Sequence, residues 1–342
     1  MKHKFKILSI DGCGIRGIIP ANIINLIETD KGSIAGLFDL IAGTSTGGII
    51  ALALASPEPL SAFEIKELYE KQGSLIFKNR QQKGILSSFA SLFNKKIKTL
   101  SNHPYDSTGI DKLMLEKFGN FLLSDCSVKT IITSYDTTRS EAFYFISRLE
   151  EAKSFYLRDV ARATSAAPSY FPPKTIERTV GNPLHLIDGG VFANNPSVLA
   201  LAEAMFLLNP ENGTKQFSSS DKSNPRILPD EELPFLIVSL GTGSCKRAID
   251  PRNLDTTGKW IEPLIEEIFM ESVSENTHFL MKQLLPNFSD GSPRYIRINI
   301  PVPKDNMKLD DVSQNNIDAL NRACEEYLDN NSQLIDKLLD LL

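Results

Sequence analysis

The sequence predicts an α/β fold in which a central, mainly parallel β-sheet is flanked by helices. Two observations carry this prediction. Short apolar runs alternate with helical patterns along the 342 residues, and the first two runs each pass through a glycine turn directly into an apolar helix. Repeated strand–turn–helix units are typical of layered folds whose sheet is parallel.

Five short apolar segments are predicted to be buried strands. Residues 5–10 and 38–42 each lead into a glycine turn, and residues 128–135 follow as a third strand. Residues 184–187 and 235–240 complete the set. The last part of the chain, after Lys308, indicates polar-faced helices at the rim of the sheet.

Two segments depart from the strand–helix pattern. Residues 210–234 are polar and rich in turn residues, which indicates a surface insertion. Residues 71–100 contain seven Lys or Arg and no acidic residue, interleaved with apolar ones. This basic segment is either a solvated helical face or a surface that binds anionic lipid, because such stretches gain from apolar burial and from phosphate attraction.

The overall composition is that of an ordinary soluble globular protein, with 42% hydrophobic and 23% charged residues. A net charge of −5 argues against a general nucleic-acid binder. Four scattered cysteines have no metal-ligand spacing and are too few for a disulfide framework, which favours a reducing, cytoplasm-like compartment. The apolar run near the N-terminus is too short for a signal peptide, and none is long enough to span a membrane.

Residues 43–47, Gly-Thr-Ser-Thr-Gly, match the G-x-S-x-G pattern of a nucleophile elbow around Ser45. The chain must turn so sharply from strand to helix that larger side chains at Gly43 and Gly47 would collide. The turn presents the serine hydroxyl at the positive end of a helix dipole. Its place between an apolar strand and an apolar helix favours this interpretation over an ordinary glycine-rich turn.

None of the four histidines is well placed to be the base that such a serine needs. His3 lies at the start of the chain, His103 in a turn, and His278 in a helical stretch without catalytic neighbours. His185 lies three residues before Asp188, and an odd spacing in a strand points two side chains to opposite faces.

Asp188 itself is the alternative base. It ends an apolar run and directly precedes Gly189 and Gly190, which let the turn approach another loop closely. A Ser–Asp dyad requires a hydrogen bond of roughly 2.6–3.2 Å, and it works best when burial raises the pKa of the aspartate. An ordinary Asp-Gly-Gly turn is the competing interpretation.

Three segments in this order, DGCGIRG, GTSTGG and DGGVFANNP, together resemble the patatin-like phospholipase family. The connecting segments FDLIAGTSTGGIIALA, ARATSAAPSYFPP, NNPSVLALAEA and LIVSLGTG are also similar to it. The resemblance is clear over residues 5–243 and loose over the last hundred. It implies a patatin-like three-layer fold, a catalytic dyad of Ser45 and Asp188 without histidine, and an oxyanion hole built from the first glycine loop.

That loop has Gly12, Gly14 and Gly17 at the spacing G-x-G-x-x-G, which often marks an anion site of backbone N–H groups. A dinucleotide site would have an acidic residue at the end of the next strand, whereas here that strand ends in the serine turn. We therefore expect N–H groups of Gly12, Cys13 and Gly14 to hold the oxyanion. Arg16 anchors either the loop or a lipid phosphate.

Cys13 departs from the family, which usually has glycine at this position. The backbone N–H survives the change, but the side chain would cost on the order of a kcal/mol or more if the position required a positive φ. It also places a thiol beside the expected catalytic serine.

The resemblance implies a phospholipase A-type lipid acyl hydrolase that releases ester-linked fatty acids through an acyl-enzyme. Residues 5–245 would form the catalytic domain, and residues 246–342 a C-terminal helical extension packed on the same domain. No metal or cofactor is expected, because no Cys/His cluster or carboxylate pair has ligand spacing. The alternatives are a non-hydrolytic lipid-binding or interaction protein on the same fold, and a dinucleotide-binding oxidoreductase.

The expected partner is membrane phospholipid at a surface, contacted through residues 71–100, and not nucleic acid. The protein would be cytoplasmic and peripheral to the membrane when acting, and secretion as an effector without a signal peptide is also compatible with the sequence. The oligomeric state is left open.

Overall fold

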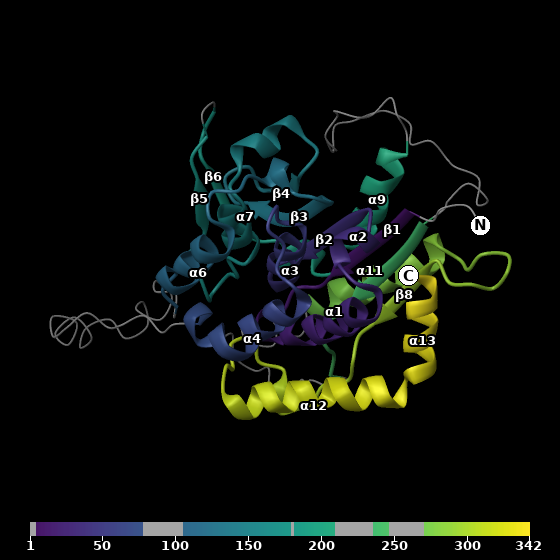
Figure 1. Cartoon of the computed structure of the whole chain (residues 1–342). Coiled ribbons are helices and arrows are strands. Elements are labelled where there is room, and N and C mark those ends of the chain that lie inside the picture. Colours follow the sequence, from purple (N-terminus) through teal and green to yellow (C-terminus); the bar gives the residue numbers. More distant parts are fainter. Residues whose placement is uncertain (1–4, 78–104, 179–180, 209–234, 246–269) are drawn as a thin grey trace, which may run out of the picture.

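The computed structural model describes residues 5–77, 105–178, 181–208, 235–245 and 270–342. These residues form a mixed eight-stranded sheet with helices on both faces (Figure 1), which confirms the predicted α/β fold. The predicted insertion at 210–234 and most of the basic segment 71–100 lie outside the described residues.

The strand order is β5-β6-β3-β2-β1-β7-β8, and β4 pairs with β3. Pairs among β1, β2, β3, β7 and β8 are parallel, whereas pairs that involve β4 or β6 are antiparallel. The five predicted strands are present, and β4, β5 and β8 were not predicted. The bounds are β1 Phe5–Ile10, β2 Leu40–Thr44, β3 Lys129–Asp136, β4 Glu141–Ile146, β5 Lys174–Ile176, β6 Leu184–Asp188, β7 Phe235–Leu240 and β8 Tyr295–Ile298.

Helices connect the strands and close the molecule. Two of them begin with a side-chain cap: the Ser61 hydroxyl accepts the Glu64 N–H before α4, and the Ser313 hydroxyl accepts the Asn316 N–H before α12. The α-helices are α1 Ile18–Lys31, α2 Ile34–Leu37, α3 Thr46–Ala55, α4 Ala62–Ile76, α6 Thr108–Phe118, α7 Leu157–Thr164, α8 Gly190–Ala193, α9 Ser197–Leu207, α11 Met270–Leu284, α12 Gln314–Asn330 and α13 Ser332–Leu341. The 3₁₀ helices are η1 Gly14–Gly17, η2 Leu123–Asp125, η3 Glu150–Ser154 and η8 Lys304–Asn306.

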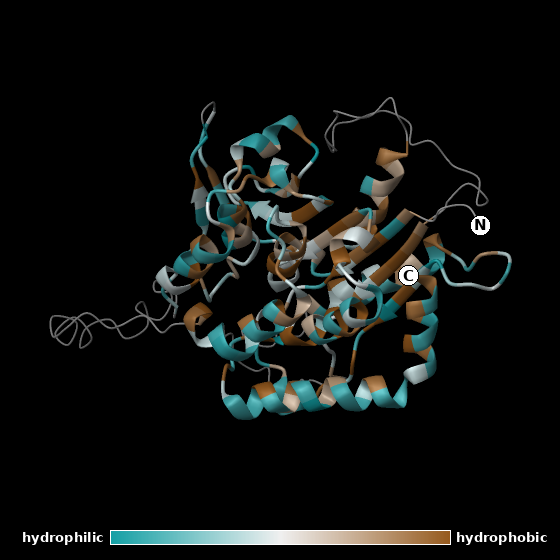
Figure 2. Ribbon diagram, viewed as in Figure 1, coloured by the Kyte–Doolittle hydropathy of each residue, from teal (hydrophilic) through white to brown (hydrophobic). Residues whose placement is uncertain are grey.

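The sheet separates two apolar cores. Successive residues of β1 alternate between them, so that Leu8 joins the core under α1, α3, α4 and α7 while Ile7 joins the core under α9. All residues of α3 are buried, as expected for a helix that is apolar on every side. Figure 2 shows the hydrophobic central strands and the largely hydrophilic α12 at the rim.

The C-terminal segment is part of the same sheet. Its strand β8 pairs with β7, and its helix α12 packs on α1. The segment was expected to be helical, and the structure shows that it also supplies a strand. Among the described helices, none combines the length and the apolar character needed to cross a bilayer.

The register on β3 brings two strand ends together. Thr44 of β2 pairs with Thr133, and Asp188 of β6 pairs with the next residue, Ser134. Since β4 also pairs with both of these β3 residues, β2 and β6 share the opposite edge of β3. They run in opposite directions along it, so their carboxyl ends meet. The predicted catalytic residues lie at this meeting point, since Ser45 directly follows β2 and Asp188 is the last residue of β6.

Candidate active site

Ser45 occupies a strained turn between β2 and α3. Its φ of 54° and ψ of −122° are rare for a residue with a side chain, and its N–H donates to Thr164 Oγ1 at 2.8 Å. A Cβ at Gly43 would lie 2.3 Å from the Gly47 carbonyl oxygen, and one at Gly47 would lie 2.2 Å from that of Ile10. Both flanking glycines are therefore required by close backbone approach, as the elbow predicts.

Asp188 ends β6 as a buried carboxyl group with 1% of its surface exposed. Its Oδ1 accepts the Gly190 N–H at 2.7 Å, whereas its Oδ2 has no hydrogen-bond partner among the described residues. Burial raises the pKa of Asp188 to about 7, partly offset by the Ser45 side chain and the Gly190 N–H. A Cβ at Gly189 would lie 2.2 Å from Thr133 Oγ1, so glycine is required there too.

Ser45 and Asp188 line the same small cavity of about 40 Å³, which is largely apolar. Aromatic rings close part of it, and the Phe77 and Phe171 ring centroids are 5.9 Å apart. Its apolar lining includes Ile49, Ile76, Phe77, Ile110, Tyr170 and Phe171. The surroundings of the serine and the carboxylate are therefore mostly apolar.

Gly12 lies where the glycine loop contacts Ser45, but its N–H is not free to bind an oxyanion. That N–H donates to the Asn194 carbonyl oxygen at 3.1 Å, which corrects the expectation that Gly12 is an oxyanion donor. A Cβ at Gly12 would lie 2.6 Å from Asn194 Oδ1 and 2.9 Å from the Ser45 Cβ. Glycine is needed here so that the loop can approach the serine.

Gly14, and not Cys13, carries the unusual backbone conformation of the loop. Gly14 has φ of +55°, and a Cβ there would lie 2.2 Å from the Leu309 carbonyl oxygen. Cys13 has φ of 161°, outside the left-handed region that favours glycine. The Gly14 N–H opens η1, where the first N–H groups have no intrahelical acceptor.

Arg16 is buried beneath the loop. Its guanidinium donates to the Gly243 carbonyl oxygen at 3.2 Å and contacts the sulfur of Cys13. These contacts favour the loop-anchoring role over the phosphate-binding role. Gly17 is packed against α3, since a Cβ there would lie 2.3 Å from Thr46 Oγ1.

The described histidines do not line the serine cavity. His185 is exposed, with its Nδ1 3.0 Å from Thr175 Oγ1, and it lies on the opposite face of β6 from Asp188 as its spacing predicts. His278 Nδ1 lies 3.2 Å from the Tyr295 hydroxyl. Within the described ranges, no three His, Cys, Asp or Glu side chains come together in a group that could hold a metal ion.

Two positioning contacts escaped the sequence analysis. Thr44 Oγ1 donates to the Ala193 carbonyl oxygen at 2.6 Å, and the next residue, Asn194, accepts from Gly12. These bonds tie the turn after Asp188 to both the serine strand and the glycine loop. Both acceptors are backbone carbonyl oxygens, which every residue type has, so the sequence carried no signal for these contacts.

Comparison with known proteins identifies relatives of this chain. A family profile described as patatin-like phospholipase matches residues 8–201. Patatin-like protein 2 of Arabidopsis thaliana is 32% identical over 94% of this chain and 82% of that protein. Calcium-independent phospholipase A2-gamma of Rattus norvegicus is 31% identical over 98% of this chain but only 40% of that protein. Among solved structures, VipD from Legionella pneumophila has a TM-score of 0.41 at 13% identity, over 95% of this chain and 67% of that one.

Proposed function

This chain belongs to the patatin-like phospholipase family of lipid hydrolases, and from that membership we propose that it is a phospholipase A-type acyl hydrolase with a Ser45–Asp188 dyad. Its substrate is an ester-linked fatty acyl chain of a membrane phospholipid or a related lipid. The hydrocarbon chain enters the apolar cavity beside Ser45. The basic segment 71–100 is the proposed contact with anionic lipid.

In the first half-reaction the Ser45 hydroxyl attacks the ester carbonyl carbon, and its proton moves to Oδ2 of Asp188. The carbonyl oxygen becomes negative and accepts hydrogen bonds from backbone N–H groups of the glycine loop, with Cys13 and Gly14 as the proposed donors. Collapse of the tetrahedral intermediate breaks the ester C–O bond. The leaving alkoxide takes the proton from Asp188, and the acyl group remains on Ser45.

In the second half-reaction a water molecule gives its proton to Asp188 and attacks the acyl-enzyme carbonyl carbon. The second tetrahedral intermediate uses the same N–H donors. Its collapse releases the fatty acid, and the Ser45 oxygen recovers the proton from Asp188. The cycle consumes one water and restores both side chains.

The observation that carries the proposal is a buried carboxylate oxygen without a partner beside a strained serine. Asp188 Oδ2 accepts no hydrogen bond from the described residues. A buried acceptor without a partner destabilises the fold, so its retention points to a functional role. A backbone conformation like that of Ser45 is retained mainly at functional sites. A dyad explains both features together.

The test combines lipid hydrolysis with chemical labelling. Wild type and Ser45→Ala are incubated with phosphatidylcholine vesicles, and released fatty acid is quantified. Both are also treated with a fluorophosphonate probe and mapped by mass spectrometry. We expect wild type to release fatty acid and to carry one probe on Ser45, and the variant to do neither. Vesicle binding by wild type without release or labelling would instead indicate a non-hydrolytic lipid-binding protein.

Hydrolysis should rise with pH through about 7, because Asp188 accepts a proton only when it is ionised and burial raises its pKa to about 7. Below that pH, kcat/KM should fall roughly tenfold per pH unit, and above it the rate should level off. The measurement is kcat/KM for a soluble ester whose own charge does not change with pH. A flat profile down to the ordinary pKa range of an exposed aspartate would count against Asp188 as the base.

A further inference from the structure

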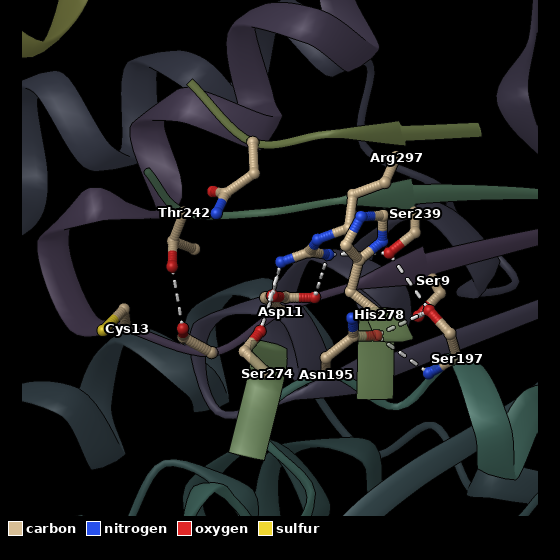
Figure 3. Close-up of polar contacts among 12 residues, drawn as sticks. Ser9, Asp11, Cys13, Asn195, Ser197, Ser239, Thr242, Ser274, His278 and Arg297 are labelled. Carbon is tan, nitrogen blue, oxygen red and sulfur yellow. Dashed lines mark hydrogen bonds and ion pairs between the residues drawn. The ribbon is translucent and has the colours of Figure 1, made fainter. Parts of the chain in front are cut away.

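A buried ion pair lies directly before the glycine loop. Arg297 of β8 donates from both terminal nitrogens to the two carboxylate oxygens of Asp11, at 3.1 and 2.6 Å (Figure 3). The two side chains are 7% and 2% exposed. Asp11 precedes Gly12 in the chain, so the carboxylate is fixed at the point where β1 ends and the loop begins.

The same guanidinium connects two further elements, β7 and α11, to Asp11. It donates to Ser239 Oγ of β7 at 2.7 Å and lies 3.1 Å from Ser274 Oγ of α11. The Ser274 hydroxyl in turn donates to Asp11 Oδ2 at 2.6 Å. Beyond this group, Thr242 Oγ1 donates to the Gly12 carbonyl oxygen at 2.9 Å (Figure 3). The loop is thus held by side chains that follow residue 201 in the chain, outside the segment that the family profile matches.

We propose that Arg297, together with Ser274, is a positioning residue that holds Asp11 and thereby sets the oxyanion-binding geometry of the glycine loop. This inference rests on the proposed function. Arg297 does not touch the reacting atoms: it lines a separate polar cavity of about 230 Å³, whose lining does not include Ser45 or Asp188. Its effect reaches the reaction only through the loop.

The geometry also explains why residue 297 is an arginine. A planar guanidinium reaches both oxygens of one carboxylate and two hydroxyls at once, whereas the single ammonium of lysine cannot occupy all four directions. Oxyanion donors act on a charge that exists only in the transition state, so their displacement lowers kcat more than it raises KM.

Arg297→Ala is expected to lower kcat for the soluble ester on the order of 100-fold, the scale of a lost oxyanion donor, with KM changed only a few-fold. Arg297→Lys should restore part of the loss. Because the polar cavity adjoins the vacated position, guanidinium at a low, non-denaturing concentration should rescue Arg297→Ala several-fold, and sodium chloride at equal ionic strength should not. Ser274→Ala, a smaller change, should lower kcat several-fold and covers the case in which Arg297→Ala does not fold.

Arg148→Ala is the matched control. Arg148 is a second buried arginine that donates to a carboxylate, Glu203, with side chains 10% and 1% exposed. Neither residue lines the serine cavity or the polar cavity, so loss of this pair should reduce stability while kcat of the folded protein stays near that of wild type.

The outcomes separate the two proposals. Absence of Ser45-dependent hydrolysis in wild type would overturn the proposed function itself. An active wild type in which folded Arg297→Ala or Ser274→Ala keeps full kcat would overturn the positioning role alone. Equal loss of kcat in the Arg148 and Arg297 variants, with no response to guanidinium, would reduce the ion pair to a structural contact.

Discussion

Asp188→Asn is expected to lower kcat for ester hydrolysis by roughly 10³-fold or more while stabilising the folded protein at pH 8. The amide cannot accept the Ser45 proton, so both half-reactions lose their base. Residues that act as one unit give non-additive losses, and the double variant with Ser45→Ala should therefore be no less active than the single variants. Retention of more than a few per cent of wild-type activity by Asp188→Asn would show that another group takes the proton.

The stabilisation follows from the pKa of Asp188, which burial raises from 3.8 to about 7. Between these two values the folded protein binds more protons than the unfolded chain, so the free energy of unfolding of wild type falls as the pH rises from about 4 to about 7. At pH 8 the folded state holds the ionised, desolvated carboxylate of Asp188. This costs about 4 kcal/mol, because one pKa unit corresponds to about 1.4 kcal/mol. The neutral amide in Asp188→Asn carries no such desolvation cost.

Urea unfolding of wild type and Asp188→Asn at pH 4 and pH 8 measures this effect. The two proteins should be closest in stability at pH 4, where the wild-type carboxyl group is largely protonated in the folded state. The variant should be the more stable of the two at pH 8. If the variant instead lost stability relative to wild type between pH 4 and pH 8, Asp188 would stabilise the fold as an ionised group.

Gly14→Ala is expected to lower kcat on the order of 100-fold and to destabilise the protein by about 2–4 kcal/mol. The added methyl group would meet the Leu309 carbonyl oxygen at 2.2 Å, a contact that only a backbone shift relieves. That shift moves the N–H donor that the proposed oxyanion site needs. The measurements are kcat with the soluble ester and the free energy of unfolding in urea.

Gly119→Ala is the control for backbone strain alone. Gly119 ends α6 with φ of +49°, close to the +55° of Gly14, but nothing lies within 4 Å of a Cβ built on it. Its substitution should destabilise the protein by about 1 kcal/mol and leave kcat unchanged. If Gly14→Ala behaves no differently from Gly119→Ala, the contact with Leu309 does not govern the loop.

Much of the site is predictable because the residues that define it lie in short, contiguous segments of the chain. The strands at 5–10 and 235–240 have the predicted bounds, since apolar runs of that length bury both faces in a layered fold. The strained turn at Ser45 was expected from its two flanking glycines, because the collision that they avoid lies within a few residues. Neighbouring residues alone set such features.

Other features arise only when distant segments meet. The role of Gly12 depends on the Asn194 carbonyl oxygen that takes its N–H, and the need for glycine at 14 depends on Leu309. The ion pair of Arg297 was not predicted, because the short apolar strand YIRI contains no carboxylate that could pair with its arginine. Its partner, Asp11, lies at the end of the first strand.

The sequence by itself determined the α/β class, the serine turn and the aspartate turn, because period, composition and glycine spacing report local backbone geometry. Only the tertiary structure decided that the two turns meet, through the register of β2 and β6 on one edge of β3. It also decided that Asp188 is buried enough to raise its pKa to about 7. Burial and register are properties of the packed sheet, and no short segment contains them.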